Sequence, residues 1–198
     1  VQEFIPGNDD DLYFCFQYYN VKGDLAASIG GRKIRQWPPL CGSTASCEVV
    51  ENPEIEELAT RFFTKIGYKG PGSMEFKRDP RDGQYILIEP TVGRVDWNNG
   101  FSEGNGIPIP VLVYNDLVGY PPPAYRRKRI PRRWIRWSAD SEAAAYYRRQ
   151  GKLGFFEWLW TCRPLVTWAM WAWDDPRPLF RRFVQKINNW SIKLKIFS

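Results

Sequence analysis

The stretch Met74-Glu-Phe-Lys-Arg-Asp-Pro-Arg-Asp-Gly83-Gln-Tyr-Ile-Leu-Ile-Glu89 decides the fold of this 198-residue chain. Two runs in which apolar and polar residues alternate flank the segment at residues 79–83, whose Asp, Pro and Gly content is typical of a turn. We therefore predict a β-hairpin with strands at residues 73–78 and 85–89.

The two glutamates of this hairpin are the first candidate functional residues. Pairing around the turn places Glu75 opposite Glu89 and Lys77 opposite Leu87. The apolar face should then be filled by Met74, Phe76, Ile86 and Ile88. Carboxylates that lie across a ladder repel each other, and a Mg²⁺ ion completed by water and phosphate oxygens removes that repulsion. In the alternative interpretation, both glutamates point into solvent or pair with an arginine.

Local signals extend the sheet and add helices. Asn52 is a typical N-cap, Pro53 suits the first helical turn, and Gly67 is a typical stop signal. Gly30-Gly31 marks a bulge or a close approach within its strand. The predicted elements are strands at residues 12–19 and 25–36, a turn at 20–24, and helices at 53–66 and 110–117.

These segments together resemble a known domain. Gln2-Glu-Phe-Ile-Pro-Gly7-Asn-Asp9, the helix, the hairpin and Leu87-Ile-Glu-Pro-Thr-Val-Gly-Arg94 follow the order found in the C-terminal half of an ATP-grasp domain. The resemblance is nearest to bacterial ATP-grasp proteins regarded as carboxylate–amine ligases and often associated with exopolysaccharide synthesis. It implies an α+β fold: an ATP-grasp C-terminal subdomain with an antiparallel sheet and helices at residues 1–119, followed by a helical extension at 120–198.

The resemblance also implies roles for residues near the nucleotide. The hinge residues Gln2, Glu3, Phe4 and Ile5 would bind ATP by reading the adenine edge through backbone groups. Asp9 would hold the ribose hydroxyls. Arg94 would contact the substrate carboxylate or a phosphate.

The metal ligands follow from the same resemblance. Glu75 and Glu89 would hold the Mg²⁺ ions that bridge the β- and γ-phosphates. Many ATP-grasp enzymes have Asn two residues after the second glutamate, whereas this chain has Thr91, which offers a single hydroxyl.

A cationic strand provides further candidates. Lys33 and Arg35 are two residues apart in a predicted strand, so they should share a face and converge on the triphosphate or an acyl phosphate. Alternatively, they belong to a solvated edge strand whose cations discourage aggregation. A small polar loop is expected at residues 41–47, either covering the site or only connecting strands. Neither Cys41 nor Cys47 is proposed as a nucleophile, because no base accompanies them.

The implied activity is that of a ligase which phosphorylates a small carboxylate with ATP and captures the acyl phosphate with an amine. The chain contains no histidine, so catalysis that depends on His is excluded. The glycine-rich loop and lysines of the first grasp subdomain are also missing from it. We therefore expect a C-terminal fragment that needs the N-terminal part of the same enzyme for turnover. The alternative is a non-catalytic, degenerate ATP-grasp module that scaffolds a polysaccharide or membrane-associated assembly.

The net charge of +6 is unevenly distributed. Residues 121–198 carry 17 Lys and Arg against 5 Asp and Glu, together with eight of the ten tryptophans. Nucleic-acid binding is disfavoured because no recognised motif accompanies the arginines. An anionic membrane or a partner enzyme is a second interpretation. The preferred interpretation is a tryptophan core within helices, at residues 141–150 and 176–195, with a solvated arginine face.

Four cysteines without a C-x-x-C pair are typical of free thiols in a reducing cytoplasm. No secretory signal or apolar run of about 20 residues occurs. We therefore expect a cytoplasmic protein, with a peripheral membrane location as the alternative.

Overall fold

A seven-stranded sheet organises the computed structural model, which describes residues 3–162, 166–170, 175–178 and 180–181. The strand order is β5-β4-β1-β2-β3-β6-β7, and neighbouring strands are antiparallel except for the parallel pair β6–β7. The strands are β1 (Leu12–Tyr19), β2 (Leu25–Trp37), β3 (Ser43–Val49), β4 (Gly70–Arg78), β5 (Tyr85–Val92), β6 (Arg133–Ile135) and β7 (Val166–Trp168). The helices are the short 3₁₀ turn η1 (Asp9–Asp11), α1 (Pro53–Lys65), α2 (Gly100–Gly104), α3 (Ile109–Val118), α4 (Trp137–Arg149) and α5 (Phe155–Thr161).

The predicted α+β class, with an antiparallel sheet and helices, is confirmed. One local prediction is wrong, because the segment expected as a loop at residues 41–47 enters strand β3 at Ser43. The small polar residues there hid the strand, which forms by pairing with β2 rather than through its own propensity.

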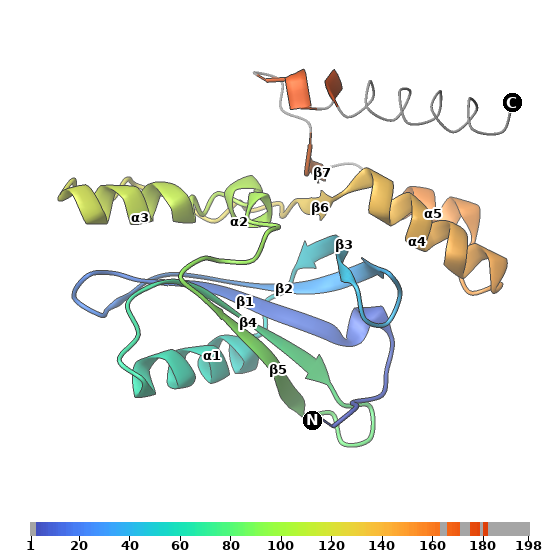
Figure 1. Ribbon diagram of the computed structural model, residues 1–198, viewed down its shortest axis with the longest axis horizontal. Coiled ribbons are helices and arrows are strands. Elements are labelled where there is room, and N and C mark those ends of the chain that lie inside the picture. Colours follow the sequence, from blue (N-terminus) through green and yellow to red (C-terminus); the bar gives the residue numbers. More distant parts are fainter. Residues whose placement is uncertain (1–2, 163–165, 171–174, 179, 182–198) are drawn as a thin grey trace, which may run out of the picture.

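Helices cover the two faces of the sheet (Figure 1). On one face α2 and α3 pack against Phe14 and Phe16 of β1. On the other face α1 packs against Cys15 of β1 and Met74 of β4. The α1 helix forms because Asn52 caps it: the Asn52 side chain accepts a hydrogen bond from the backbone N–H of Ile55 at 3.4 Å.

Gly31 permits the tight packing of the α2–α3 face. A Cβ atom at this position would lie 2.3 Å from a ring carbon of Phe14, so only glycine fits beneath that ring. The close approach expected at residues 30–31 is therefore confirmed.

A bulge in β2 changes which face each cation occupies. Lys33 pairs with Cys47 and Arg35 with Ser46, so Ile34 is an extra residue without a partner in the ladder. One extra residue reverses the alternation of side chains. The prediction that Lys33 and Arg35 share a face is therefore wrong.

A second bulge shifts the register of the hairpin. Glu75 pairs with Glu89 as predicted, but Phe76 then pairs with Leu87 and Lys77 with Ile86. Ile88 is the extra residue, and it lines a cavity on the face of Glu75 instead of filling the core. The predictions that Lys77 opposes Leu87 and that Ile86 and Ile88 join the core are wrong, whereas Met74 and Phe76 are buried as predicted.

Buried polar contacts join the extension to the sheet. Asp140 of α4 is fully buried and accepts hydrogen bonds from Arg35 Nε at 2.7 Å and from Arg35 Nη2 at 3.0 Å. The indole Nε1 of Trp158 in α5 also donates to this carboxylate at 2.9 Å. Strands β6 and β7 of the extension thus join the same sheet, and α4 and α5 are bonded to it through Arg35. The domain boundary at 119 stays a prediction.

The predicted tryptophan core is wrong for most of the described rings. Trp134 is 2% exposed, but Trp137, Trp160 and Trp168 are exposed by 48%, 70% and 36%. The helix predicted at 141–150 corresponds to α4, which begins earlier, at Trp137. Most of the helix predicted at 176–195 lies outside the described residues. The rings of Trp171, Trp173 and Trp190 lie wholly outside them. No helix in the described part of the chain is both long and apolar enough to cross a bilayer.

Candidate functional site

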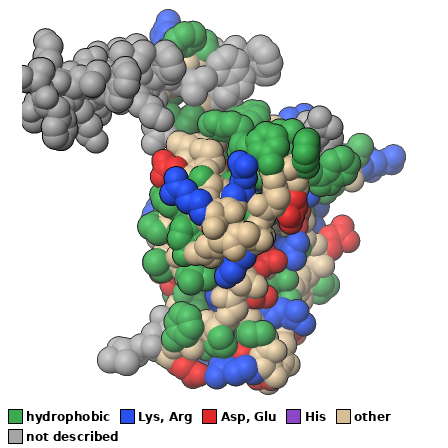
Figure 2. All heavy atoms as spheres, turned by 90° about the vertical axis from the view of Figure 1, so that its right-hand side faces the viewer, with side chains coloured by type: hydrophobic (Ala, Val, Ile, Leu, Met, Phe, Trp, Pro, Cys, Tyr) green, Lys and Arg blue, Asp and Glu red, His purple; other side chains and the backbone are tan. Residues whose placement is uncertain are grey.

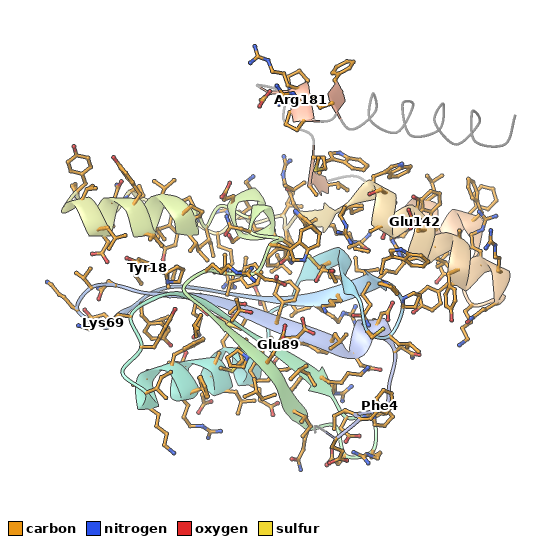
Figure 3. All side chains as sticks on the ribbon, viewed as in Figure 1. Phe4, Tyr18, Lys69, Glu89, Glu142 and Arg181 are labelled. Carbon is orange, nitrogen blue, oxygen red and sulfur yellow. The ribbon has the colours of Figure 1, made fainter. Side chains whose placement is uncertain are left out.

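A cavity of about 460 Å³ lies on the α2–α3 face, at the end of the sheet where β1 begins. Its walls come from the hinge segment, the central strands, the 40–44 turn, the hairpin and the loop after β5. The lining residues are Glu3, Phe4, Ile5, Leu12, Lys33, Gln36, Leu40, Cys41, Gly42, Ser43, Thr44, Glu75, Lys77, Ile88, Glu89, Asp96 and Trp97. Figure 3 locates Glu89 on β5 and Phe4 on the segment that leads into η1.

The central contact of the cavity is an ion pair between β2 and β4, the two strands on either side of β1. Lys33 Nζ lies 2.8 Å from Glu75 Oε2, and the Lys33 side chain is 4% exposed. Lys33 also lies 3.5 Å from the side-chain oxygen of Gln36. The β2 bulge makes this possible, since Lys33 faces the cavity while Arg35 turns to the extension.

Negative charge exceeds positive charge around this ion pair. Burial raises the pKa of the Glu75 carboxyl above its ordinary 4.5, the ammonium of Lys33 opposes that rise, and the charges of Asp96 and Glu89 add to it. The Lys33 ammonium thus pairs with a carboxyl group that two further carboxylates oppose, and the second lysine of the cavity, Lys77, is bonded to backbone carbonyls. This balance favours a further cation at this end of the cavity.

The raised pKa of Glu75 predicts a pH-dependent contribution to stability. Because the folded state holds this proton more tightly than the unfolded state, the contribution is fully present below pH 4.5 and disappears as pH rises through the raised pKa. Glu75→Gln lacks the titrating group. We expect its free energy of unfolding, relative to the wild type, to increase between about pH 4 and pH 8 in urea titrations. A difference that stays constant across this range would contradict the shift.

The carboxylates fit Mg²⁺ only together with other oxygen ligands. Among the described residues, no three metal-binding side chains lie close enough to form a complete site. Mg²⁺ is commonly held by one or two carboxylates plus water and substrate phosphates. Glu75 and Glu89, paired across β4 and β5, meet that requirement.

Asp96 and Trp97 are cavity residues that the sequence analysis missed. They follow Gly93, whose φ of 78° ends β5 and turns the chain back toward the sheet. No local motif marks them, and this glycine is the only signal. The extension fixes Trp97 in place, since the Arg136 guanidinium lies 4.4 Å from its ring centroid and Trp134 packs edge-on at 4.9 Å.

The hinge segment forms the opposite wall. Ile5 is buried, whereas Phe4 is 76% exposed, which leaves an aromatic ring at the mouth of the cavity. Lys77 of β4 holds the segment that follows the hinge, because its ammonium donates hydrogen bonds to the carbonyls of Gly7 at 3.3 Å and Asn8 at 3.2 Å. Gln2, also expected here, lies outside the described residues.

The Asp9 side chain is buried and hydrogen-bonded rather than open to the cavity. It is 3% exposed, and it accepts hydrogen bonds from the backbone and side chain of Gln36, the N–H of Leu40 and the hydroxyl of Tyr147. With both carboxylate oxygens engaged, Asp9 has no oxygen left for ribose hydroxyls. In this structure these bonds tie η1 to β2 and α4, and the ribose contact stays a prediction.

Three other predicted site residues lie away from the cavity lining. Arg35 pairs with Asp140 on the opposite face of the sheet, so it does not join Lys33 at a phosphate site. Thr91 pairs with Ser73 beyond Glu89, and Arg94 is exposed on the turn after β5. The structure thus brings together Glu3, Phe4, Ile5, Lys33, Glu75 and Glu89.

Comparison with solved structures identifies the class of fold. The biotin carboxylase complex with β,γ-ATP from Campylobacter jejuni superposes with a TM-score of 0.52 at 18% identity, over 64% of this chain and 29% of that one. No protein-family model matches the chain. The fold is that of ATP-grasp domains.

The relationship also appears in sequence. D-aspartate ligase of Enterococcus faecium (strain Aus0004) is 29% identical over 121 residues, which make up 60% of this chain and 28% of the ligase. The chain is therefore similar in sequence to part of this ligase, and it spans well under half the length of this curated relative.

Proposed function

We propose that this chain is the C-terminal part of an ATP- and Mg²⁺-dependent carboxylate–amine ligase that acts through an acyl phosphate. The observation that carries the proposal is the Lys33–Glu75 ion pair, which faces Glu89 and Asp96 in a cavity walled by the hinge segment. The substrates are ATP, a small carboxylate and an amine. The relationship to D-aspartate ligase supports an amino acid as one of them.

In the proposed reaction, a carboxylate oxygen of the first substrate attacks the γ-phosphorus of ATP, and ADP leaves. The amine then attacks the acyl carbon of the resulting acyl phosphate, inorganic phosphate leaves, and the nitrogen loses a proton as the amide forms. Lys33, which lines the cavity, would neutralise charge on the transferring phosphoryl group. Glu75 and Glu89 would hold Mg²⁺, which supplies further charge neutralisation on the phosphates.

The proposal predicts that loss of Lys33 affects kcat more than ATP affinity. Lys33→Ala, made in the enzyme completed by its N-terminal part, is expected to lower kcat by about 10²- to 10³-fold. ATP affinity should fall much less, because the hinge segment and the rest of the clamp hold the nucleotide. The measurements are ADP release with pairs of amino acids and nucleotide-dependent thermal stabilisation.

Lys77→Ala is the matched control, since Lys77 lines the same cavity. Its ammonium is engaged by the carbonyls of Gly7 and Asn8, just after the hinge segment. It should affect nucleotide affinity more than kcat. Wild-type enzyme that releases no ADP with any carboxylate and amine pair, although it binds Mg²⁺-ATP, would contradict the ligase proposal and favour a non-catalytic module.

A further inference from the structure

The α5 helix and the turn before it form a surface that the proposed ligase reaction does not use. None of the residues of α5 is buried. Phe156 is 82% exposed, Trp160 is 70% exposed and Phe155 is 46% exposed. Three large exposed rings on a helix of seven residues are a concentrated apolar surface, and such surfaces typically mark contact sites.

Cations border these rings. Arg148 and Arg149 end α4, and Lys152 lies in the turn that leads to α5; all three are exposed. The Arg148 guanidinium lies 5.1 Å from the ring centroid of Phe155. In Figure 2, hydrophobic side chains gather over the upper part of the face, with Lys and Arg side chains beside them.

The neighbouring acidic group is already engaged. Glu157 Oε2 accepts a hydrogen bond from the N–H of Gly154 at 3.2 Å, where it caps the start of α5. We call the set of Arg148, Arg149, Lys152, Phe155, Phe156 and Trp160 the aromatic–basic surface.

We propose that the aromatic–basic surface binds an anionic membrane. The rings enter the headgroup layer, where Trp and Phe are favoured, and the cations contact the acidic lipid headgroups. Charge complementarity selects this partner, since Arg148, Arg149 and Lys152 border the rings and the acidic side chain of α5, Glu157, is bonded to the N–H of Gly154. This contact is peripheral and does not depend on the ligase proposal.

Vesicle sedimentation of the full 198-residue chain tests the proposal. The chain should sediment with phosphatidylcholine vesicles that contain phosphatidylglycerol and remain in solution with phosphatidylcholine alone. Added salt should weaken the binding, because exposed charges are screened. Arg148→Gln, Arg149→Gln and Lys152→Gln together should reduce binding by roughly fivefold per cation.

The ring contribution is tested by the Phe156→Ser/Trp160→Ser double variant, which should lose most vesicle binding. Both rings are exposed, so its thermal melt should match the wild type, and the loss is not a folding effect. Tyr114→Ser/Leu117→Ser is the matched control. It removes two exposed apolar side chains, 60% and 70% exposed, from α3, and vesicle binding should be unchanged.

Three outcomes would overturn the proposal. The first is equal binding to neutral and anionic vesicles, or none to either. The second is binding that survives the Phe156→Ser/Trp160→Ser change. The third is a chain that ignores vesicles but self-associates in sedimentation velocity, with the association lost in the same variant. That result would assign the surface to a second copy of the chain.

Discussion

Asp140→Ala is expected to lower the free energy of unfolding by about 3–5 kcal/mol. Asp140 is fully buried and neutralises the Arg35 guanidinium, whose side chain is 5% exposed. Removing the carboxylate leaves a buried positive charge that, within the described part of the chain, still donates a hydrogen bond to Thr161 Oγ1 at 2.7 Å. It also removes the acceptor of the Trp158 indole. For a chain of this size the loss corresponds to a fall in Tm of roughly 10 °C.

Urea and thermal melts at neutral pH measure this loss. Glu142→Ala is the matched control, because Glu142 is an exposed carboxylate on the same helix, and its replacement should change stability by less than about 0.5 kcal/mol. The double variant Arg35→Met/Asp140→Leu should lose less stability than Asp140→Ala, since it leaves no unpaired buried charge. If Asp140→Ala melts like Glu142→Ala, the ion pair does not anchor the extension.

Glu89→Gln, made in the completed ligase, is expected to lower ADP release by at least about 100-fold. Replacing a residue that only hydrogen-bonds to a metal ligand typically lowers metal affinity or activity by about 10- to 100-fold, and Glu89 is proposed as a direct ligand. The fold should persist because glutamine is isosteric and relieves the repulsion between Glu89 and the opposing Glu75. Mn²⁺ binding in the presence of ADP, followed by electron paramagnetic resonance, should weaken in parallel.

Thr91→Ala is the matched control on the same strand. Thr91 does not line the cavity, so turnover and Mn²⁺ binding should remain near wild-type values. A similar loss in Thr91→Ala would assign that hydroxyl to the metal site. Unchanged turnover in Glu89→Gln would contradict the proposed mechanism.

Short-range signals were sufficient for much of the fold. The Asp-Pro-Arg-Asp-Gly turn and the Asn52 cap act within a few residues, so the hairpin and α1 were predictable from the sequence. The opposition of Glu75 and Glu89 followed from the turn alone. These two residues and Lys33 are the part of the site that local patterns located.

The rest depends on pairing between distant segments. The bulge at Ile34 exists only because β2 pairs with β3, and the alternation within β2 gives no sign of it. Arg35 was misplaced for this reason. The burial of Asp9 likewise depends on Tyr147 of α4, which is more than a hundred residues away in sequence. Asp96 reaches the cavity through a reversal at Gly93 rather than through a strand.

The bulge at Ile34 also determines how this strand tolerates mutation. Lys33 faces the cavity and Arg35 faces Asp140. The single unpaired residue between them lets one strand contribute both to the cavity and to the contact with α4. Substitutions of Ile34 keep the bulge. Deleting Ile34 would make the lysine and the arginine adjacent on a regular strand, and adjacent strand residues also face opposite sides of the sheet. The opposite placement of the two cations is therefore compatible with two spacings, adjacent residues on a regular strand or residues separated by one bulged residue, and neither depends on the identity of that middle residue.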